Sequence, residues 1–195
     1  MDKIYSDIWK LAKPYYQKGR SHDIPHIEWM MGKADRIAGI EGLEKRILLP
    51  TCILHDVGYV GVNGDIPRCK DKELKILHME KGAQIADNIL TQVSYDPKLA
   101  EVIVYNVSVH DNWILNDSAP FKNSREMALF NDLDFLWGVS NKEIFEVTGR
   151  GMGLGPKETY EFWLHDEKLA KRPFCCKETQ KMWKLYMAER KKEFF

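Results

Sequence analysis

The chain has 195 residues, enough for one domain with a substantial buried core. Hydrophobic residues make up 44% and charged residues 30% of it, a balance typical of a globular protein rather than a disordered one. Its 29 basic and 29 acidic side chains cancel, which argues against non-specific nucleic-acid binding, because that function needs a marked basic excess. A local basic pocket for a phosphate ester is compatible with this balance.

The N-terminal residues include acids and lack an unbroken apolar stretch, so they do not resemble a signal peptide. No segment approaches the roughly 18 consecutive apolar residues of a membrane-spanning helix. We therefore expect a cytoplasmic protein with no membrane segment. The four cysteines contain no CxxC pair, so neither a thiolate zinc site nor a disulfide framework is indicated. Cys175 and Cys176 are adjacent, and two reduced thiols are the expected state, with a redox pair as the alternative.

Apolar residues three to four positions apart predict a first helix that opens at Asp23 and Pro25 and closes at Gly39. A second helix is predicted over residues 43–54. Pro50 is expected to kink or split it, because proline has no N–H to donate within a helix.

A third helix is predicted over residues 74–93. Asp96 and Pro97 together form a strong start signal for a fourth, which runs toward His110. Residues 102–109 are rich in β-branched side chains, as in a strand, but no hairpin partner accompanies them, and we interpret them as helix.

Ser124 is expected to cap a helix that runs to Trp137. The glycine-dense residues 149–156 predict a loop or a lid, and residues 177–192 predict an amphipathic helix. No repeat, low-complexity tract or linker interrupts the chain, which indicates a single domain.

Five polar residues lie on apolar helix faces in five separate segments. Burying an unpaired imidazole or carboxylate costs several kcal/mol, so each would need its own hydrogen-bond partner unless a shared cation satisfies all of them. A single inward histidine or aspartate is ordinarily a core residue with a satisfied hydrogen bond, but five are better explained by a metal. The five are His26, His55, His78, His110 and Asp132.

Their order resembles the HD superfamily of metal-dependent phosphohydrolases, whose pattern is a lone His, a His-Asp pair, further histidines in two-metal members, and a late Asp. The resemblance covers residues 21–138. It departs at Asn131, where alanine is usual, and at Asp111, where some two-metal families have another histidine. The GYP tripeptide of the cyclic-dinucleotide class is absent. The matching segments read SHDIPH, LHDVG, ILHMEKGAQIA, VSVHDNW and LFNDLDFLWG.

This resemblance implies an all-α, single-domain helical bundle over residues 1–195, with the motif core in 21–138 and a C-terminal helical extension in 139–195. One or two divalent transition metals are implied, and imidazole with carboxylate ligation suits Mn, Fe, Ni, Co or Zn. His55 and Asp56 are the implied catalytic residues. The first metal would be held by His26, His55, Asp56 and Asp132, and the second by Asp56, as a bridging ligand, with His78 and His110.

The implied function is a phosphohydrolase that cleaves a phosphomonoester or phosphodiester of a nucleotide or similar small molecule by metal-activated hydroxide. The absence of a G-x-S-x-G elbow and of a P-loop agrees with chemistry that needs no side-chain nucleophile. Two alternatives stay open: a mixed-valent di-iron oxygenase of the HD type, and a non-catalytic metal-binding module. The sequence leaves the oligomeric state undecided.

Other residues near these ligands have candidate roles. Asp23 and Asp111 would orient imidazoles, although Asp23 is equally typical of a helix cap. Trp113 would stack on a base, but a core tryptophan is favoured. Four basic residues in flanking loops are candidates for the substrate phosphate, although each is individually more typical of solvated surface: Arg68, Lys70, Lys122 and Arg125.

Overall fold

Helices account for all regular structure in residues 2–62 and 72–195, the part of the chain that the computed structural model describes. The predicted all-α class is confirmed. None of the helices in these ranges is both long and apolar enough to cross a membrane. The α-helices are α1 Lys3–Lys18, α2 Ile24–Glu41, α3 Lys45–Leu54, α4 Lys72–Gln92, α5 Pro97–Val109, α6 Ala119–Asn123, α7 Arg125–Trp137, α8 Lys142–Gly151, α9 Pro156–Leu164, α10 Lys168–Lys171 and α11 Lys177–Phe194, and the 3-10 turns are η1 Ser21–Asp23, η2 Val57–Tyr59 and η3 Asn112–Leu115.

Two of the predicted capping residues, Asp96 and Ser124, begin their helices with side-chain hydrogen bonds. The Asp96 side chain accepts hydrogen bonds from the backbone N–H groups of Lys98 and Leu99 at the start of α5. Ser124 accepts one from the N–H of Met127 at the start of α7. These contacts satisfy N–H groups that have no partner within the first turn, which sets where each helix starts.

Pro50 lies inside α3, so of the predicted kink or split the split does not occur. A proline at this position leaves the carbonyl of Arg46, four residues earlier, without its usual N–H donor. The hydroxyl of Tyr95 donates to that carbonyl at 2.7 Å and replaces the missing bond. The whole segment from Leu48 to Leu54 is buried, so packing also favours a continuous helix.

Two other boundaries differ from the predicted ones. Helix α2 continues past Gly39 to Glu41 and ends at Gly42, whose φ of 64° is the left-handed conformation that glycine adopts without strain. The predicted loop over 149–156 is shorter, because α8 extends to Gly151 and α9 begins at Pro156.

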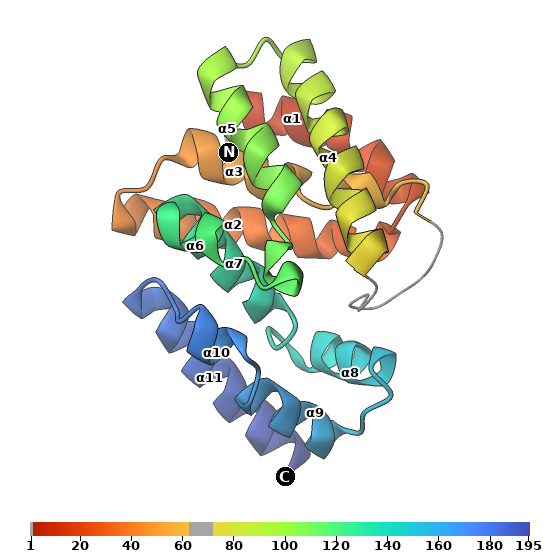
Figure 1. The fold of residues 1–195 in the computed structure, drawn as a ribbon. Helices are drawn as coiled ribbons and strands as arrows, with labels where there is room; N and C mark the ends of the chain where they lie inside the picture. The colour runs from red at the N-terminus through yellow and green to blue at the C-terminus, as the bar shows by residue number, and fades with distance from the viewer. Residues whose placement is uncertain (1, 63–71) are drawn as a thin grey trace.

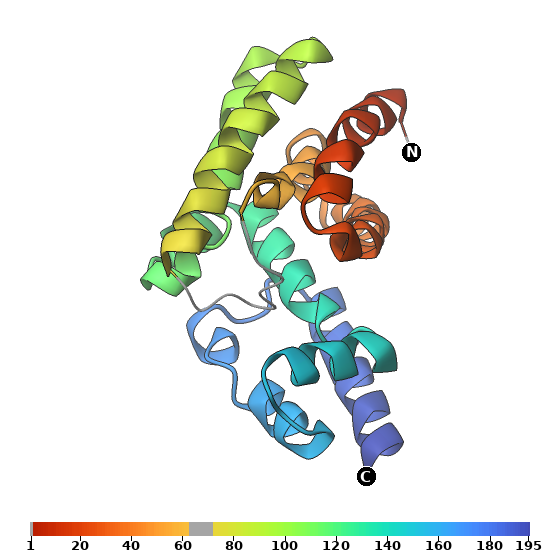
Figure 2. The ribbon, with the colours of Figure 1, turned by 90° about the vertical axis from the view of Figure 1, so that its right-hand side faces the viewer.

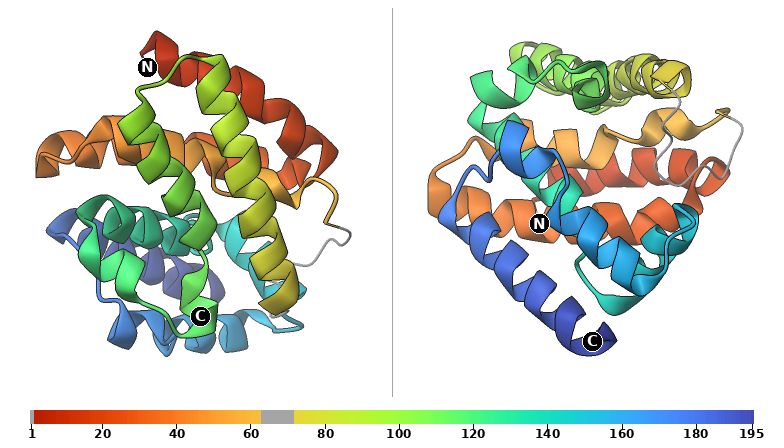
Figure 3. Two further views of the ribbon diagram at one scale, coloured as in Figure 1. Left: turned by 45° about the horizontal axis from the view of Figure 1, so that its top comes forward. Right: turned by 60° about the horizontal axis from the view of Figure 1, so that its bottom comes forward.

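The chain forms two groups of helices that meet at α7 (Figure 1). Helix α7 contacts α2 and α3 on one side and α11 on another. Helices α4 and α5 lie side by side along one flank, and α8 to α11 gather near the C-terminus (Figures 2 and 3). Because α7 is enclosed in this way, eight of its thirteen residues are buried.

A close backbone approach joins η2 to α4. A Cβ atom added at Gly58 would lie 1.9 Å from the carbonyl oxygen of His78 and 2.5 Å from the backbone nitrogen of Gly82. Only glycine fits at this contact, since a side chain would force the two segments apart. The contact places the end of α3 against the middle of α4, where His78 lies.

Candidate metal centre

Four buried histidines and a buried aspartate meet where α2, α3, α4 and α5 converge. His26 lies in the first turn of α2, His78 lies within α4, and His55 and His110 are the C-terminal cap residues of α3 and α5. Asp56 follows His55 directly. Each of the five is at most 9% exposed. The structure therefore brings together five of the six residues predicted as metal ligands.

The two helix-capping histidines are oriented by the helices that they terminate. Nδ1 of His55 lies 3.0 Å from the carbonyl oxygen of Cys52, and Nδ1 of His110 lies 2.7 Å from that of Val107. Because a carbonyl can only accept, both Nδ1 atoms carry the hydrogen, and carbonyls left free in the last helical turn are satisfied. In the neutral rings this leaves the lone pair on Nε2, which faces the cluster.

The two oxygens of Asp56 face different histidines. Oδ2 lies 3.3 Å from Nε2 of His55, whereas Oδ1 lies 3.3 Å from Nε2 of His110 and 3.7 Å from Nε2 of His78. Asp56 therefore lies between two groups of donor atoms.

The first group combines His26 and His55 with Asp134 of α7. Oδ1 of Asp134 lies 3.4 Å from Nε2 of His26 and 4.0 Å from Nε2 of His55. One donor atom from each of the three residues lies within 4.8 Å of the others. The Asp134 side chain is 29% exposed, so it forms the solvent-facing edge of this group.

The second group consists of Asp56, His78 and His110. The Nε2 atoms of the two histidines lie 3.1 Å apart. Ligands about 2.1 Å from one transition-metal ion are separated by about 3.0 Å at right angles and by about 3.4 Å at the tetrahedral angle. The three separations of 3.1, 3.3 and 3.7 Å are close to these values.

Unsatisfied nitrogens give an independent test of whether this donor set fits a metal. Nε2 of His26 and Nε2 of His55 are buried and have no hydrogen-bond partner in the described residues. Buried polar atoms nearly always have a partner, so such atoms need an explanation. Imidazole nitrogens together with carboxylate oxygens are the donors that divalent transition metals take. The residues present therefore fit a metal.

The charges within the cluster depend on how each group is surrounded. Burial lowers the pKa of His26 and that of His78 to about 3, so both rings are neutral at pH 7. Burial also acts to lower the pKa of His55, but the negative charges of Asp56 and Asp134 outweigh it and raise that pKa to about 9. Burial alone would raise the pKa of Asp56, yet His55 and His110 hold it well below its usual range.

Two ion pairs between described residues border the cluster. Lys75 pairs with Asp111, whose Oδ2 lies 3.4 Å from Nε2 of His78, and Asp111 also accepts a hydrogen bond from the indole N–H of Trp113. On the other side, Arg20 pairs with Asp23 at 2.9 Å. Asp23 makes no capping hydrogen bond to α2, so its side chain serves this ion pair.

Aromatic rings enclose two of the histidines. Tyr59 stacks on His78 with ring centroids 4.2 Å apart, and Trp137 stacks on His26 with centroids 5.2 Å apart. These contacts hold the imidazoles in fixed orientations and exclude water from their faces. Trp113, considered as a base-stacking residue, is only partly buried and packs against the core.

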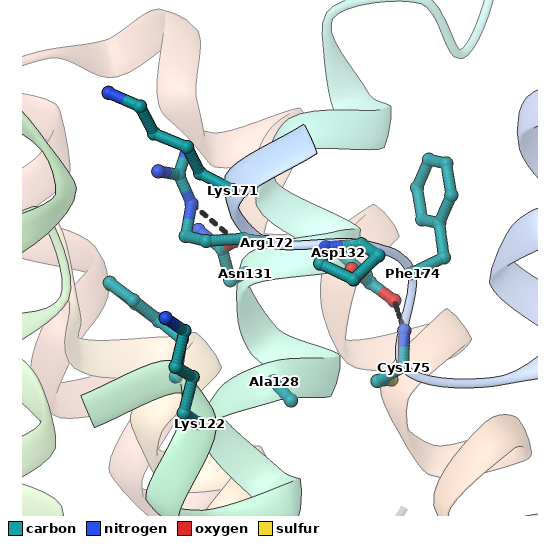
Figure 4. A pocket seen from close by; sticks show the side chains of 10 residues that line it. Lys122, Ala128, Asn131, Asp132, Lys171, Arg172, Phe174 and Cys175 are labelled. Atoms are coloured by element: carbon teal, nitrogen blue, oxygen red, sulfur yellow. Dashed lines mark hydrogen bonds between the residues drawn. The ribbon is translucent and has the colours of Figure 1, made fainter. Parts of the chain in front are cut away.

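Asp132, the sixth predicted ligand, does not join this cluster. Its carboxylate accepts a hydrogen bond from the backbone N–H of Cys175 at 2.8 Å (Figure 4). It also accepts hydrogen bonds from the Lys168 ammonium and from the Thr179 hydroxyl, the latter at 2.7 Å. All three donors come from the C-terminal segment. Asp132 is buried, as predicted, but against α10 and α11 rather than against the histidines.

The sequence reasoning missed Asp134, which takes the place expected for Asp132. The two residues are separated by one position in α7, so they point about 200° apart around the helix. The sequence contained one signal for Asp134: the NDLD segment has a second aspartate, two residues after Asp132.

The four candidate phosphate-binding residues have different surroundings. Arg68 and Lys70 lie outside the described residues. Arg125 is exposed and bonds to Glu41, at 3.2 Å to its carbonyl and 3.7 Å to its carboxylate. Lys122 is exposed and lines a cavity beside α7 that contains none of the metal-site histidines.

Comparison of the chain with models of protein families, with curated proteins and with solved structures found no match.

Proposed function

We propose that this protein is a metal-dependent phosphohydrolase of the HD type, which cleaves a phosphomonoester or phosphodiester of a nucleotide or similar small molecule. Two features support the proposal: the buried imidazole and carboxylate donors, and the order of the motifs from SHDIPH to NDLD along the chain. The residues proposed to hold metal are His26, His55, Asp56, Asp134, His78 and His110.

The observation that carries the proposal is the position of Asp56 between the two donor groups. Each of its oxygens faces a different group at 3.3 Å from the nearest imidazole nitrogen. A carboxylate in this position suits two cations that share one ligand. Two divalent cations about 3.5–4 Å apart bind phosphoryl oxygens, acidify a water molecule and stabilise the leaving oxygen.

The protein's own residues would then position and balance these cations. Neutral His26 and His78 add no charge, so Asp56 and Asp134 supply the negative charge that offsets the cations. Asp134 lies at the exposed edge, where a phosphate ester can approach from solvent. Trp137 stacks on the imidazole of His26 and Tyr59 on that of His78, which fixes the orientation of both rings.

The first test combines metal analysis with a substrate panel. Wild-type protein purified without added metal is analysed for bound elements and assayed on phosphomonoesters, phosphodiesters and nucleotides. Asp56→Ala should lower metal content and abolish hydrolysis while the protein stays helical by circular dichroism. Asp87→Ala, an exposed aspartate on α4, is the matched control and should behave as wild type. Undiminished turnover by Asp56→Ala would reject the proposal, and turnover that requires O2 would support an oxygenase instead.

The second test counts the cations. Metal is titrated into stripped wild-type protein and into a His78→Ala, His110→Ala double variant. Two sites in the wild type and one in the double variant are expected, because the second group loses both imidazoles. If the two proteins bind the same number of metal ions and turn over equally fast, the two-metal assignment is wrong and the enzyme uses a single metal.

A further inference from the structure

A cavity lies beside α7, away from the metal-site histidines. It has a volume of about 270 Å³ and is bounded by α6, by α7 and by the segment that joins α10 to α11 (Figure 4). This volume is close to the lower limit of small-molecule sites, about 300 Å³.

Arg172 lines this cavity, and most of its side-chain N–H groups have no hydrogen-bond partner among the described residues. Arg172 is only 8% exposed. Nε donates to Oδ1 of Asn131 at 3.2 Å, and the guanidinium lies 5.5 Å from the centroid of the Trp113 ring. Among the described residues, no carboxylate or carbonyl bonds to its two terminal nitrogens. A buried arginine is normally paired, so these donors are available to an anion.

Asn131 explains why the guanidinium is held at this position. It is 4% exposed and lies on α7. Its amide oxygen accepts a hydrogen bond from Nε of Arg172 (Figure 4). This bond fixes the guanidinium, whose other N–H groups have no partner among the described residues.

The side chains that line the cavity carry more positive than negative charge, and the carboxylates of Asp166, Glu167 and Asp111 also act on Arg172 without bonding to it. Asp132 is neutralised by Lys168 and accepts two further hydrogen bonds, so its carboxylate is fully engaged. Lys171 pairs with Glu167 at 2.7 Å. Lys122 is exposed at the rim on the same side as Arg172, and no ion pair engages it among the described residues (Figure 4).

Apolar side chains complete the lining. Phe121 is buried, and Pro173, Phe174 and Cys175 also line the cavity, although the Phe174 ring packs against Phe135 and Trp183. Ligand sites commonly combine apolar walls with a few fixed polar groups, the walls contacting the ligand body and the polar groups orienting it.

We propose that this cavity binds a small molecule with a phosphate or carboxylate group on an apolar ring, with the anion held by Arg172 and Lys122. The ring would lie against Phe121 and Pro173. The assignment does not depend on the proposed metal-dependent activity, because the cavity shares no residue with the metal centre.

The test uses the full-length protein stripped of metal, so that the metal centre does not contribute an anion site. Phenyl phosphate, benzoate, inorganic phosphate and phenol are titrated while NMR follows the Arg172 Nε–H and the Cys175 backbone N–H. Phenyl phosphate or benzoate should shift both signals, and phenol should not. The tighter binder of the two identifies the anion as phosphate or carboxylate, and comparison with inorganic phosphate measures the contribution of the ring.

Arg172→Gln should weaken binding of the better probe at least about tenfold, the effect expected when hydrogen bonds to a charged group are lost. Lys122→Gln should weaken it about threefold to fivefold, because an exposed charge contributes less. Lys10→Gln, an exposed lysine of α1, is the matched control and should bind as wild type. Unchanged affinity in both cavity variants, or an equal loss in Lys10→Gln, would overturn the proposal. If Arg172→Gln does not fold, an unshifted Arg172 Nε–H in the wild-type titration overturns it equally.

Discussion

Oδ1 of Asp134 lies 3.4 Å from Nε2 of His26, at the solvent-facing edge of the metal centre. Because Asp134 contributes a carboxylate to the first donor group, Asp134→Ala should weaken metal binding by more than the 10–100-fold that is typical of changes outside the ligand set. Elemental analysis and metal titration measure this effect. Asp35→Ala, an exposed aspartate of α2, is the control. Wild-type affinity in Asp134→Ala would remove Asp134 from the site.

Asp132→Asn should lower stability rather than metal affinity. The substitution leaves the buried Lys168 ammonium without its counter-charge, and breaking such a pair from one side costs about 3–5 kcal/mol. Urea denaturation of the metal-free protein measures the free energy of unfolding. Glu167→Gln breaks the exposed Lys171 pair and should change stability by less than about 0.5 kcal/mol. A loss of metal with unchanged stability in Asp132→Asn would contradict this division of roles.

Metal affinity should rise with pH because a proton must leave His55. With a pKa of about 9 in the metal-free protein, His55 is protonated at pH 7, and its Nε2 lone pair becomes free only on deprotonation. Apparent affinity should therefore increase about tenfold per pH unit from this group as pH rises toward 9, and then level off. Asp56 keeps its charge over this range, since its pKa is held well below its usual value.

Calorimetry in buffers with different ionisation enthalpies checks the expected release of about one proton at pH 7. A His55→Asn variant should bind more weakly and release correspondingly fewer protons. His26 and His78 are already neutral at pH 7 and should not contribute to the release. Proton release that is unchanged in His55→Asn would assign the proton to another group.

Gly58→Ala should destabilise the protein by about 1–3 kcal/mol, since its Cβ would overlap the His78 carbonyl and displace α4. The same movement shifts His78, so the second metal group should lose affinity as well. The control is Gly32→Ala in α2, where an added Cβ meets nothing within 4 Å and should stabilise by about 0.5–1 kcal/mol. Denaturation and metal titration distinguish the two, and a Gly58→Ala protein as stable as Gly32→Ala would contradict the close approach.

Local signals in the sequence accounted for much of the helical structure. Asp96 and Ser124 start their helices as predicted, because a capping bond involves only residues two or three positions apart. Pro50 does not split its helix, and the carbonyl that it leaves free is satisfied by Tyr95, which lies far along the chain. A rule based on neighbouring residues in the sequence cannot predict that contact.

The sequence by itself determined that His26, His55, His78 and His110 are buried, because a polar residue at the spacing of an apolar helix face must point inward. It likewise marked Asp132 as buried between Leu129 and Leu136. Tertiary structure alone decided which neighbour that aspartate meets. Helix α7 is enclosed by α2 and α3 on one side and by α11 on another, so an inward position does not specify a partner. Lys168 and Thr179 engage Asp132 from the C-terminal segment, and the remaining aspartate, Asp134, faces the histidines.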